Sequence, residues 1–137
     1  MSSSGNCEHC ERDFSYSLIH NRFNDSAFAY CDKCGRTATF SAWSKKPKEA
    51  VFQQGTLSSH LESFVAPCEC GGKFRSDASP RCPHCNEPLS AELGATYIER
   101  NAPGTAKGWR WQRNWKGLYS IVIEGQSAKD PWDPARL

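Results

Sequence analysis

Short stretches rich in β-branched and aromatic residues recur along the chain, separated by polar breaks that contain Gly, Pro or Ser. This pattern predicts β-strands, because such side chains suit an extended backbone on a half-buried surface. The predicted strands cover residues 28–30, 37–43, 73–75, 96–100 and 118–123, and the last of them is the strongest. We therefore expect a mostly β protein.

One segment has helical spacing instead. Between Thr56 and Ala66, four apolar residues lie at positions i, i+4, i+7 and i+8, which places them on one face of a short helix. They are Leu57, Leu61, Phe64 and Val65. Thr56 is a suitable N-cap, and Pro67 ends the helix. We expect this face to pack on a flanking unit, with partner binding as the alternative. A further helical turn is predicted at 90–94.

A tryptophan-rich segment, residues 108–125, alternates with a period of two. Its two faces carry Trp109, Trp111, Arg113 and Trp115 on one side and Arg110, Gln112 and Asn114 on the other. Lys116-Gly117 separates this stretch from the strand at 118–123, which predicts an antiparallel β-hairpin. Residues 126–137 are predicted to form an extended or loosely docked tail.

The eight cysteines occur as four closely spaced pairs, with none left over. The pairs are Cys7 and Cys10, Cys31 and Cys34, Cys68 and Cys70, and Cys82 and Cys85. Two such pairs supply the four thiolates of a tetrahedral metal site, so the sequence predicts two structural Zn²⁺ ions, with iron as the alternative metal. A disulfide framework and a redox-active CxxC are the other uses that such cysteines have.

Composition favours the metal. Hydrophobic residues make up 38% of the 137 positions, and mean hydropathy is −0.68, so each half of the chain has little apolar surface to bury. A structural zinc site contributes on the order of 10–16 kcal/mol to folding. No apolar signal-peptide core follows Met1, and no apolar run is long enough to span a bilayer. We therefore expect a cytoplasmic protein with reduced thiols and no membrane partner.

The sequence leaves open which cysteine pairs share an ion. Local pairing joins the first pair to the second and the third to the fourth; interleaved pairing joins the first to the third and the second to the fourth. The longer loop of the interleaved arrangement costs only about 1 kcal/mol more in closure entropy. We predict local pairing, because each half has its own aromatic residues and strands.

The cysteine pairs, with a glycine directly after Cys34 and after Cys70, resemble the zinc-ribbon and rubredoxin-like class over residues 6–43 and 66–89. The whole chain resembles small uncharacterised bacterial proteins with two four-cysteine zinc ribbons. The resemblance implies a small metal-stabilised α+β fold, mostly β, with two zinc ribbons, one short helix between them and a C-terminal hairpin. Members of the class serve in transcription, translation, RNA handling and scaffolding. The Cys68-x-Cys70 pair departs from the usual CxxC form.

The predicted organisation has five parts. They are a first zinc ribbon (1–46), a linker with a short helix (47–67), a second zinc ribbon (68–89), a strand with the Trp-rich hairpin (90–125) and an extended tail (126–137). The core of the first ribbon is predicted to contain Phe14, Tyr16, Phe23, Phe28, Phe40 and Trp43. We expect His9 and His84 to be exposed in the cysteine loops rather than to act as ligands.

We expect no enzymatic activity and no small-molecule substrate. Four thiolates close the coordination sphere of zinc, and the chain has none of the common phosphate-binding, dinucleotide-binding or hydrolase motifs. The formal charge is +2, but each four-thiolate zinc site adds two negative charges, which leaves about −2 in the loaded protein. A globally basic nucleic-acid binder is therefore not indicated.

The function that we predict is a non-catalytic protein-interaction module or adaptor. Its candidate contact residues are Trp109, Arg110, Trp111, Arg113, Trp115 and Lys116, because tryptophan and arginine dominate protein interfaces. The alternative is single-stranded RNA or DNA, with the tryptophans stacked on bases and the basic residues on phosphates. In a third interpretation, the tryptophans simply cover the sheet.

Overall fold

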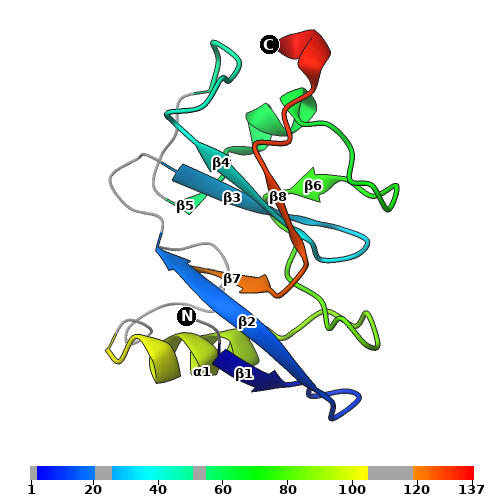
Figure 1. The fold of residues 1–137 in the computed structure, drawn as a ribbon, viewed down its shortest axis with the longest axis vertical. Helices are drawn as coiled ribbons and strands as arrows, with labels where there is room; N and C mark the ends of the chain where they lie inside the picture. Colours follow the sequence, from blue (N-terminus) through cyan, green and yellow to red (C-terminus); the bar gives the residue numbers. More distant parts are fainter. Residues whose placement is uncertain (1–2, 21–25, 51–54, 105–118) are drawn as a thin grey trace.

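The computed structural model describes residues 3–20, 26–50, 55–104 and 119–137. Its first sheet, sheet A, has three antiparallel strands in the order β1-β2-β7 (Figure 1). The strands are β1 (Ser3–Asn6), β2 (Asp13–His20) and β7 (Tyr119–Ile123). β7 confirms the strand predicted at 118–123, and it pairs with β2. Its predicted hairpin partner, residues 109–115, lies outside the described residues.

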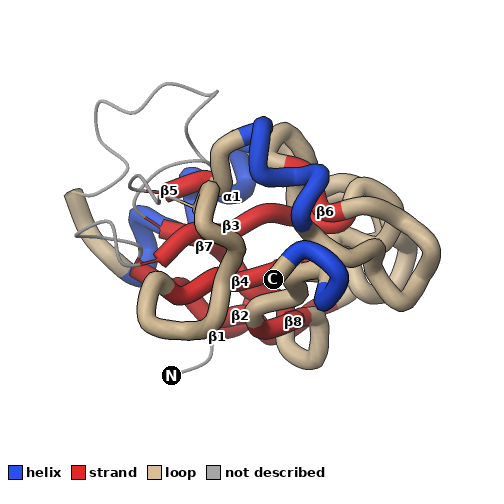
Figure 2. Tube along the Cα trace, turned by 90° about the horizontal axis from the view of Figure 1, so that it is seen from above, coloured by secondary structure: helices blue, strands red, loops and turns tan. Residues whose placement is uncertain are grey.

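The second sheet, sheet B, has the order β5-β3-β4-β8, and β6 pairs with the end of β3. Its strands are β3 (Ser26–Cys31), β4 (Thr37–Ser41), β5 (Gly55–Thr56), β6 (Phe74–Arg75) and β8 (Ser127–Lys129). The antiparallel β3–β4 hairpin confirms the strands predicted on either side of Cys31 and Cys34. β5 and β8 run parallel to β3 and β4, respectively. Figure 2 shows the strands at the centre, with many of the loops gathered on one side.

Two hydrophobic clusters fill the molecule. Core A surrounds sheet A and α1, and contains Phe14, Tyr16, Phe28, Tyr30, Leu89, Tyr97, Ile98, Ile121 and Ile123. Core B lies under sheet B, and contains Ala27, Ala29, Ala38, Phe40, Ala50, Leu57, Leu61, Phe74 and Trp132. β3 contributes to both cores, because successive side chains of a strand point to opposite faces. Sheet B is therefore buried on both sides of β3.

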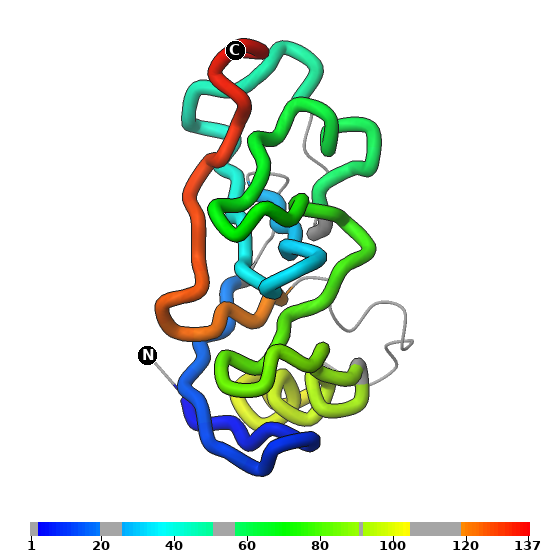
Figure 3. Tube along the Cα trace, turned by 90° about the vertical axis from the view of Figure 1, so that its right-hand side faces the viewer, coloured from blue at the N-terminus to red at the C-terminus, as the bar shows by residue number. Residues whose placement is uncertain are grey.

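The helix α1 (Ala91–Asn101) lies where a helical turn and then a strand at 96–100 were predicted, and that strand prediction is wrong. Thr96, Tyr97 and Ile98 favour strands by propensity, but packing overrides propensity here. Tyr97 and Ile98 are buried in core A, and Leu93, one helical turn earlier, packs against it. Figure 3 shows α1 beside the N-terminal strands of sheet A at one end of the elongated molecule, and the C-terminus at the other.

The helix predicted at 56–66 is shorter and of the 3-10 type. It is η1 (Ser59–Phe64), while Thr56 belongs to β5 rather than capping the helix. The apolar face packs inward as expected, since Leu57 and Leu61 are buried in core B.

The tail is not loosely docked. β8 pairs with β4, and η3 (Pro134–Arg136) follows it. Trp132 is only 4% exposed, and its ring lies 4.7 Å from that of Phe40. The tail is therefore part of core B.

The predicted aromatic core of the first half is only partly correct. Phe14, Tyr16 and Phe28 lie in core A and Phe40 in core B, so these four residues do not share one core. Trp43 was expected to be buried but is 86% exposed, because β4 ends at Ser41 and a turn carries the indole away from the sheet. Phe23 lies outside the described residues. Among the described ranges, no helix is long and apolar enough to cross a bilayer.

Candidate metal centres

The eight cysteines form two quartets, and their pairing is nested. Centre A contains Cys7, Cys10, Cys82 and Cys85, and centre B contains Cys31, Cys34, Cys68 and Cys70. The first cysteine pair thus joins the fourth, and the second joins the third. The predicted local pairing is wrong, and the interleaved alternative does not occur either.

Strand pairing explains the nesting. β6 begins four residues after Cys70 and pairs with the last residues of β3, with Phe74 opposite Cys31, so the Cys68–Cys70 loop is placed beside the tip of the β3–β4 hairpin. The Cys82–Cys85 loop leads into α1, which packs on sheet A, and so it meets the tip of the β1–β2 hairpin. The sheets, rather than loop length, decide which cysteines meet.

The sulfur positions suit a tetrahedral ion. In centre A, the Sγ atoms of Cys7 and Cys85 are 3.6 Å apart, and those of Cys10 and Cys82 are 3.7 Å apart. In centre B, the corresponding distances are 3.4 Å for Cys31 and Cys70 and 3.6 Å for Cys34 and Cys68. Four Zn–S bonds of about 2.3 Å in a tetrahedron put sulfurs about 3.8 Å apart. A disulfide needs about 2.05 Å, and all eight cysteines are free.

All four cysteine loops share one backbone turn. The residue after the second cysteine has positive φ, and its N–H donates to the carbonyl of the first cysteine at 2.9–3.0 Å. These residues are Glu11 (φ 62°), Gly35 (φ 75°), Gly71 (φ 93°) and Asn86 (φ 61°). In all four loops, the N–H of the first cysteine donates to a carbonyl beyond this residue. The turn therefore aims both thiols of a pair to the same side.

The Cys68-x-Cys70 loop is one residue shorter, and glycine compensates for this. The N–H of Cys68 donates to the carbonyl of Gly72, four residues on, instead of the five residues in the other loops. A Cβ atom on Gly72 would lie 2.6 Å from the Sγ of Cys31 and 2.7 Å from the Cβ of Lys33. Gly72 thus leaves the space that the shorter loop needs to approach its partner thiol.

Backbone N–H groups point at the sulfurs. The amides of His9, Lys33 and His84 donate to the first thiol of their own loops at 3.3–3.4 Å. In the short loop, the amide of Gly72 donates to Cys70 at 3.4 Å instead. Such donors stabilise thiolates, and they are the expected surroundings of metal-bound cysteine.

The thiol pKa values show how the quartets share charge. Burial raises the pKa of Cys7, but the N–H groups of Cys10 and His9 and two neighbouring thiols lower it to about 7. The pKa of Cys70 is likewise lowered to about 7, against the effect of burial, by the Gly72 N–H and neighbouring thiols. Burial raises the pKa of Cys31 to about 12, in spite of two N–H donors. One thiol in each quartet therefore has a lowered pKa, and a bound cation would favour the thiolate form of the others.

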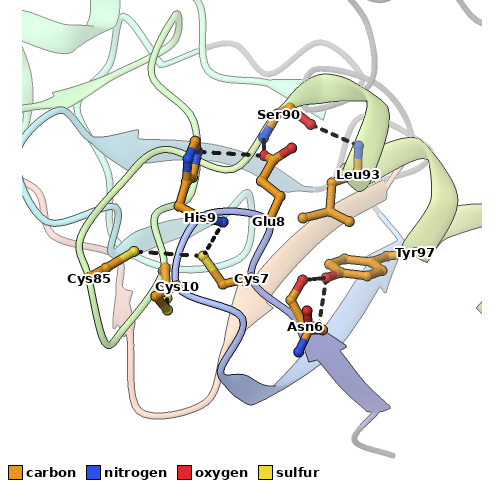
Figure 4. A network of polar contacts seen from close by, with 10 residues as sticks. Asn6, Cys7, Glu8, His9, Cys10, Cys85, Ser90, Leu93 and Tyr97 are labelled. Carbon is orange, nitrogen blue, oxygen red and sulfur yellow. Dashed lines mark hydrogen bonds and ion pairs between the residues drawn. The ribbon is translucent and has the colours of Figure 1, made fainter.

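Centre A is tied to α1 by a carboxylate. Oε1 of Glu8, inside the first cysteine loop, accepts the N–H of the N-cap residue Ser90 at 2.7 Å, while Ser90 Oγ accepts the N–H of Leu93 at 3.1 Å (Figure 4). In a capping box, a Glu or Gln at the third helical position accepts the N–H of the N-cap residue. That position is Leu93 here, so Glu8, from outside the helix, accepts this N–H instead. The hydroxyl of Tyr97 also donates to the carbonyl of Asn6 at 2.8 Å and accepts the N–H of Asn6 at 2.9 Å.

The other predicted site residues do not join the centres. His9 and His84 are outside both quartets, as expected; Nε2 of His84 lies 2.9 Å from the carbonyl oxygen of Asp13, and that of His9 lies 3.9 Å from Glu8. The candidate contact residues Trp109, Arg110, Trp111, Arg113, Trp115 and Lys116 lie outside the described residues.

Sequence reasoning missed the contact of Glu8 with Ser90. It also missed the hydrogen bonds of Arg81 and Asn86 to the backbone of the Cys31–Cys34 loop. A repeated signal was available: residues 7–12 read CEHCER and residues 31–36 read CDKCGR, with an acidic residue after the first cysteine of each loop. This similarity marks the two loops as equivalent turns, but it does not select the partner loop of either one.

The chain belongs to a family described as a domain of unknown function (DUF8255), whose model matches residues 3–91. The matched region contains all eight cysteines and ends at the first residue of α1. No curated protein and no solved structure matches the chain.

Proposed function

We propose that this protein binds two structural zinc ions and acts as a non-catalytic protein-interaction module or adaptor. The observation that carries the proposal is the donor set: each quartet offers four sulfur atoms within 4.8 Å of one another, with two sulfur pairs in each at 3.4–3.7 Å. Thiolate sets of this kind select zinc or iron among the common biological metals. Four sulfur ligands leave no coordination position for water or substrate, which supports a structural role.

An exposed tryptophan supports the interaction part of the proposal. Trp43 is 86% exposed in the turn after β4, and its backbone N–H donates to Ser41 Oγ at 3.2 Å. A large aromatic side chain in water gains more than other side chains when a partner covers it. Trp43 is therefore a candidate anchor, in addition to the tryptophan-rich segment.

The zinc part is tested by native mass spectrometry and elemental analysis of the untagged protein. We expect two zinc ions per chain and no disulfide. A protein that folds with no bound metal, or one with intramolecular disulfides in place of metal, would contradict it.

The interaction part is tested by capture from the native host, with Trp43→Ala compared against Ile19→Ala. Ile19 is 37% exposed on sheet A, so its change removes exposed apolar surface elsewhere. We expect a co-purifying protein that Trp43→Ala loses and Ile19→Ala keeps, with both variants holding two zinc ions. Capture of nucleic acid alone, in a salt-dependent and nuclease-sensitive form, would instead support the single-stranded RNA or DNA alternative.

A further inference from the structure

The two centres are in direct contact through side chains that flank the second loop of centre A. Arg81 precedes Cys82, and Asn86 follows Cys85. Nη2 of Arg81 donates to the carbonyl of Asp32 at 3.1 Å, and Nδ2 of Asn86 donates to the carbonyl of Lys33 at 3.1 Å. Both acceptors lie between Cys31 and Cys34, inside a loop of centre B. Each ligand loop is thus held by the other.

The guanidinium of Arg81 also spans its own loop. Its Nη1 donates to the backbone carbonyl of Asn86 at 2.9 Å, which links the residues before and after Cys82–Cys85. One planar group therefore contacts the backbone of both centres. Its position depends on whether the Cys82–Cys85 loop is closed.

Glycine allows this contact at short range. Gly35, at positive φ in the turn of centre B, faces the backbone of Arg81, and a Cβ atom there would lie 2.4 Å from the amide nitrogen of Arg81. The two loops consequently touch without an intervening side chain.

We propose that this contact, the Arg81–Asn86 brace, makes the two centres bind metal cooperatively, so that filling one raises the affinity of the other. The inference rests on the proposed zinc binding. The loops have little apolar surface of their own: Asp32, Lys33, Pro83 and His84 are all exposed. Their ordering must therefore be driven by the ion and by the contacts that the brace adds.

The expected size follows from two hydrogen bonds. Once one ion has fixed its loop, the donors or acceptors of the brace are already in place for the other loop, so the second ion binds to a partly ordered site. Both hydrogen bonds are exposed, and two bonds in the lower half of the usual range of net strength correspond to about tenfold in affinity. Coupling of this kind is reciprocal. An ion in centre A therefore raises the zinc affinity of centre B by the same factor as an ion in centre B raises that of centre A. The protein then passes from empty to fully loaded over a narrow range of zinc concentration.

The test is native mass spectrometry of the full chain with zinc below saturation. The measured quantity is a population ratio. It is the metal-free population multiplied by the two-zinc population and divided by the square of the one-zinc population. For two independent sites this ratio never exceeds about one quarter, whatever their affinities, and positive coupling multiplies it. We expect this ratio to be about tenfold lower in the double variant, Arg81→Ala with Asn86→Gly, than in the wild type. Glycine at position 86 keeps the positive φ while removing the amide.

Arg136→Ala is the matched control. Arg136 is an exposed arginine near the C-terminus whose guanidinium lies over the ring of Phe64, 5.2 Å from the ring centroid. It should leave the ratio at the wild-type value. A brace variant whose ratio equals that of the wild type would overturn the inference, although both zinc ions still bind. A protein that takes up no zinc at all would instead refute the proposed function.

Discussion

At the scale of single residues, the positive φ after each cysteine pair is the most demanding feature. Glycine meets this demand in two loops, and asparagine tolerates it in a third. Glu11 meets it least well, because a side chain with a Cβ pays about 1–2 kcal/mol in the left-handed region.

Glu11→Gly is therefore expected to stabilise the protein by about 0.5–1 kcal/mol, since the relief of strain exceeds the extra chain entropy that glycine loses. The Glu11 side chain is exposed, and the contact that Asn6 Nδ2 makes at this residue is to its backbone carbonyl. Denaturant unfolding in saturating zinc measures the change. Asn86→Gly is the comparison, and it should not stabilise, because Asn86 also donates to Lys33. A lower unfolding midpoint for Glu11→Gly would contradict the strain argument.

Gly72→Ala should selectively weaken centre B. The new Cβ would meet the Sγ of Cys31 and the Cβ of Lys33 at 2.6 and 2.7 Å, so the thiol must move off its position. Native mass spectrometry in limiting zinc is expected to show a larger share of the one-zinc form than in the wild type. Gly71→Ala is the control: it meets only Lys33 Nζ at 3.9 Å, and so it strains the backbone without displacing a thiol. Equal metal affinities in the two variants would count against the steric explanation.

The cysteines and their metal could be predicted from residue types alone, because their spacing is itself a ligand pattern. The exposure of Trp43 could not, because it depends on β4 ending at Ser41 and not on hydrophobicity. Arg81 and Asn86 were equally invisible. Their donors meet carbonyls about fifty residues away, and only the folded loops bring them together.

At the scale of elements, a tyrosine hydroxyl joins the two sheets. Tyr30 on β3 accepts the N–H of Ile121 on β7 and donates to its carbonyl, both at 3.1 Å. Thr37 Oγ1 on β4 donates to the same carbonyl at 3.3 Å. The hydroxyl thus satisfies backbone groups on the free edge of β7 that a neighbouring strand would otherwise pair with. Burial raises the pKa of Tyr30 far above its usual range.

Tyr30→Phe is expected to cost about 1–3 kcal/mol, because it leaves the buried N–H of Ile121 without this partner. Thr37→Val removes one of two donors to the Ile121 carbonyl and should cost less. Denaturant unfolding in saturating zinc compares the two variants. A larger loss for Thr37→Val, or no loss for Tyr30→Phe, would show that the sheets are not joined in this way.

Elements were predictable where local sequence and packing agree, as in β3, β4 and β7. They were not where tertiary contacts decide. Thr96-Tyr97-Ile98 favours a strand, yet core A and the Glu8–Ser90 cap make it part of α1. In the tail, Ser127–Lys129 has no strand signal and becomes β8 because it lies beside β4.

At the scale of the whole molecule, each metal centre is joined to one hydrophobic core. Core A contains Cys7 and Cys82 of centre A, and core B contains Cys31 and Cys68 of centre B. A zinc site contributes on the order of 10–16 kcal/mol, as much as the entire net stability of an ordinary domain, about 5–15 kcal/mol.

Removal of zinc by a chelator should therefore unfold both cores together. We expect the near-ultraviolet circular dichroism and the amide-exchange protection of β3 and α1 to disappear, and to return when zinc is added. Native signals that survive complete chelation would show that apolar burial is sufficient without the metal.

Nesting of the cysteine pairs could not be predicted because it is a property of the complete topology. β6 must pair with β3, and α1 must pack on sheet A, before Cys68 and Cys82 have defined partners. Loop-closure entropy distinguishes the possible pairings by only about 1 kcal/mol, so no local feature selects among them.

The most direct test of this account is the heteronuclear NMR correlation between cadmium and the cysteine β-protons in the cadmium-loaded protein. One cadmium signal should correlate with Cys7, Cys10, Cys82 and Cys85, and the other with Cys31, Cys34, Cys68 and Cys70. A cadmium signal that correlates with both Cys7 and Cys31 would contradict the nested pairing and the fold that produces it.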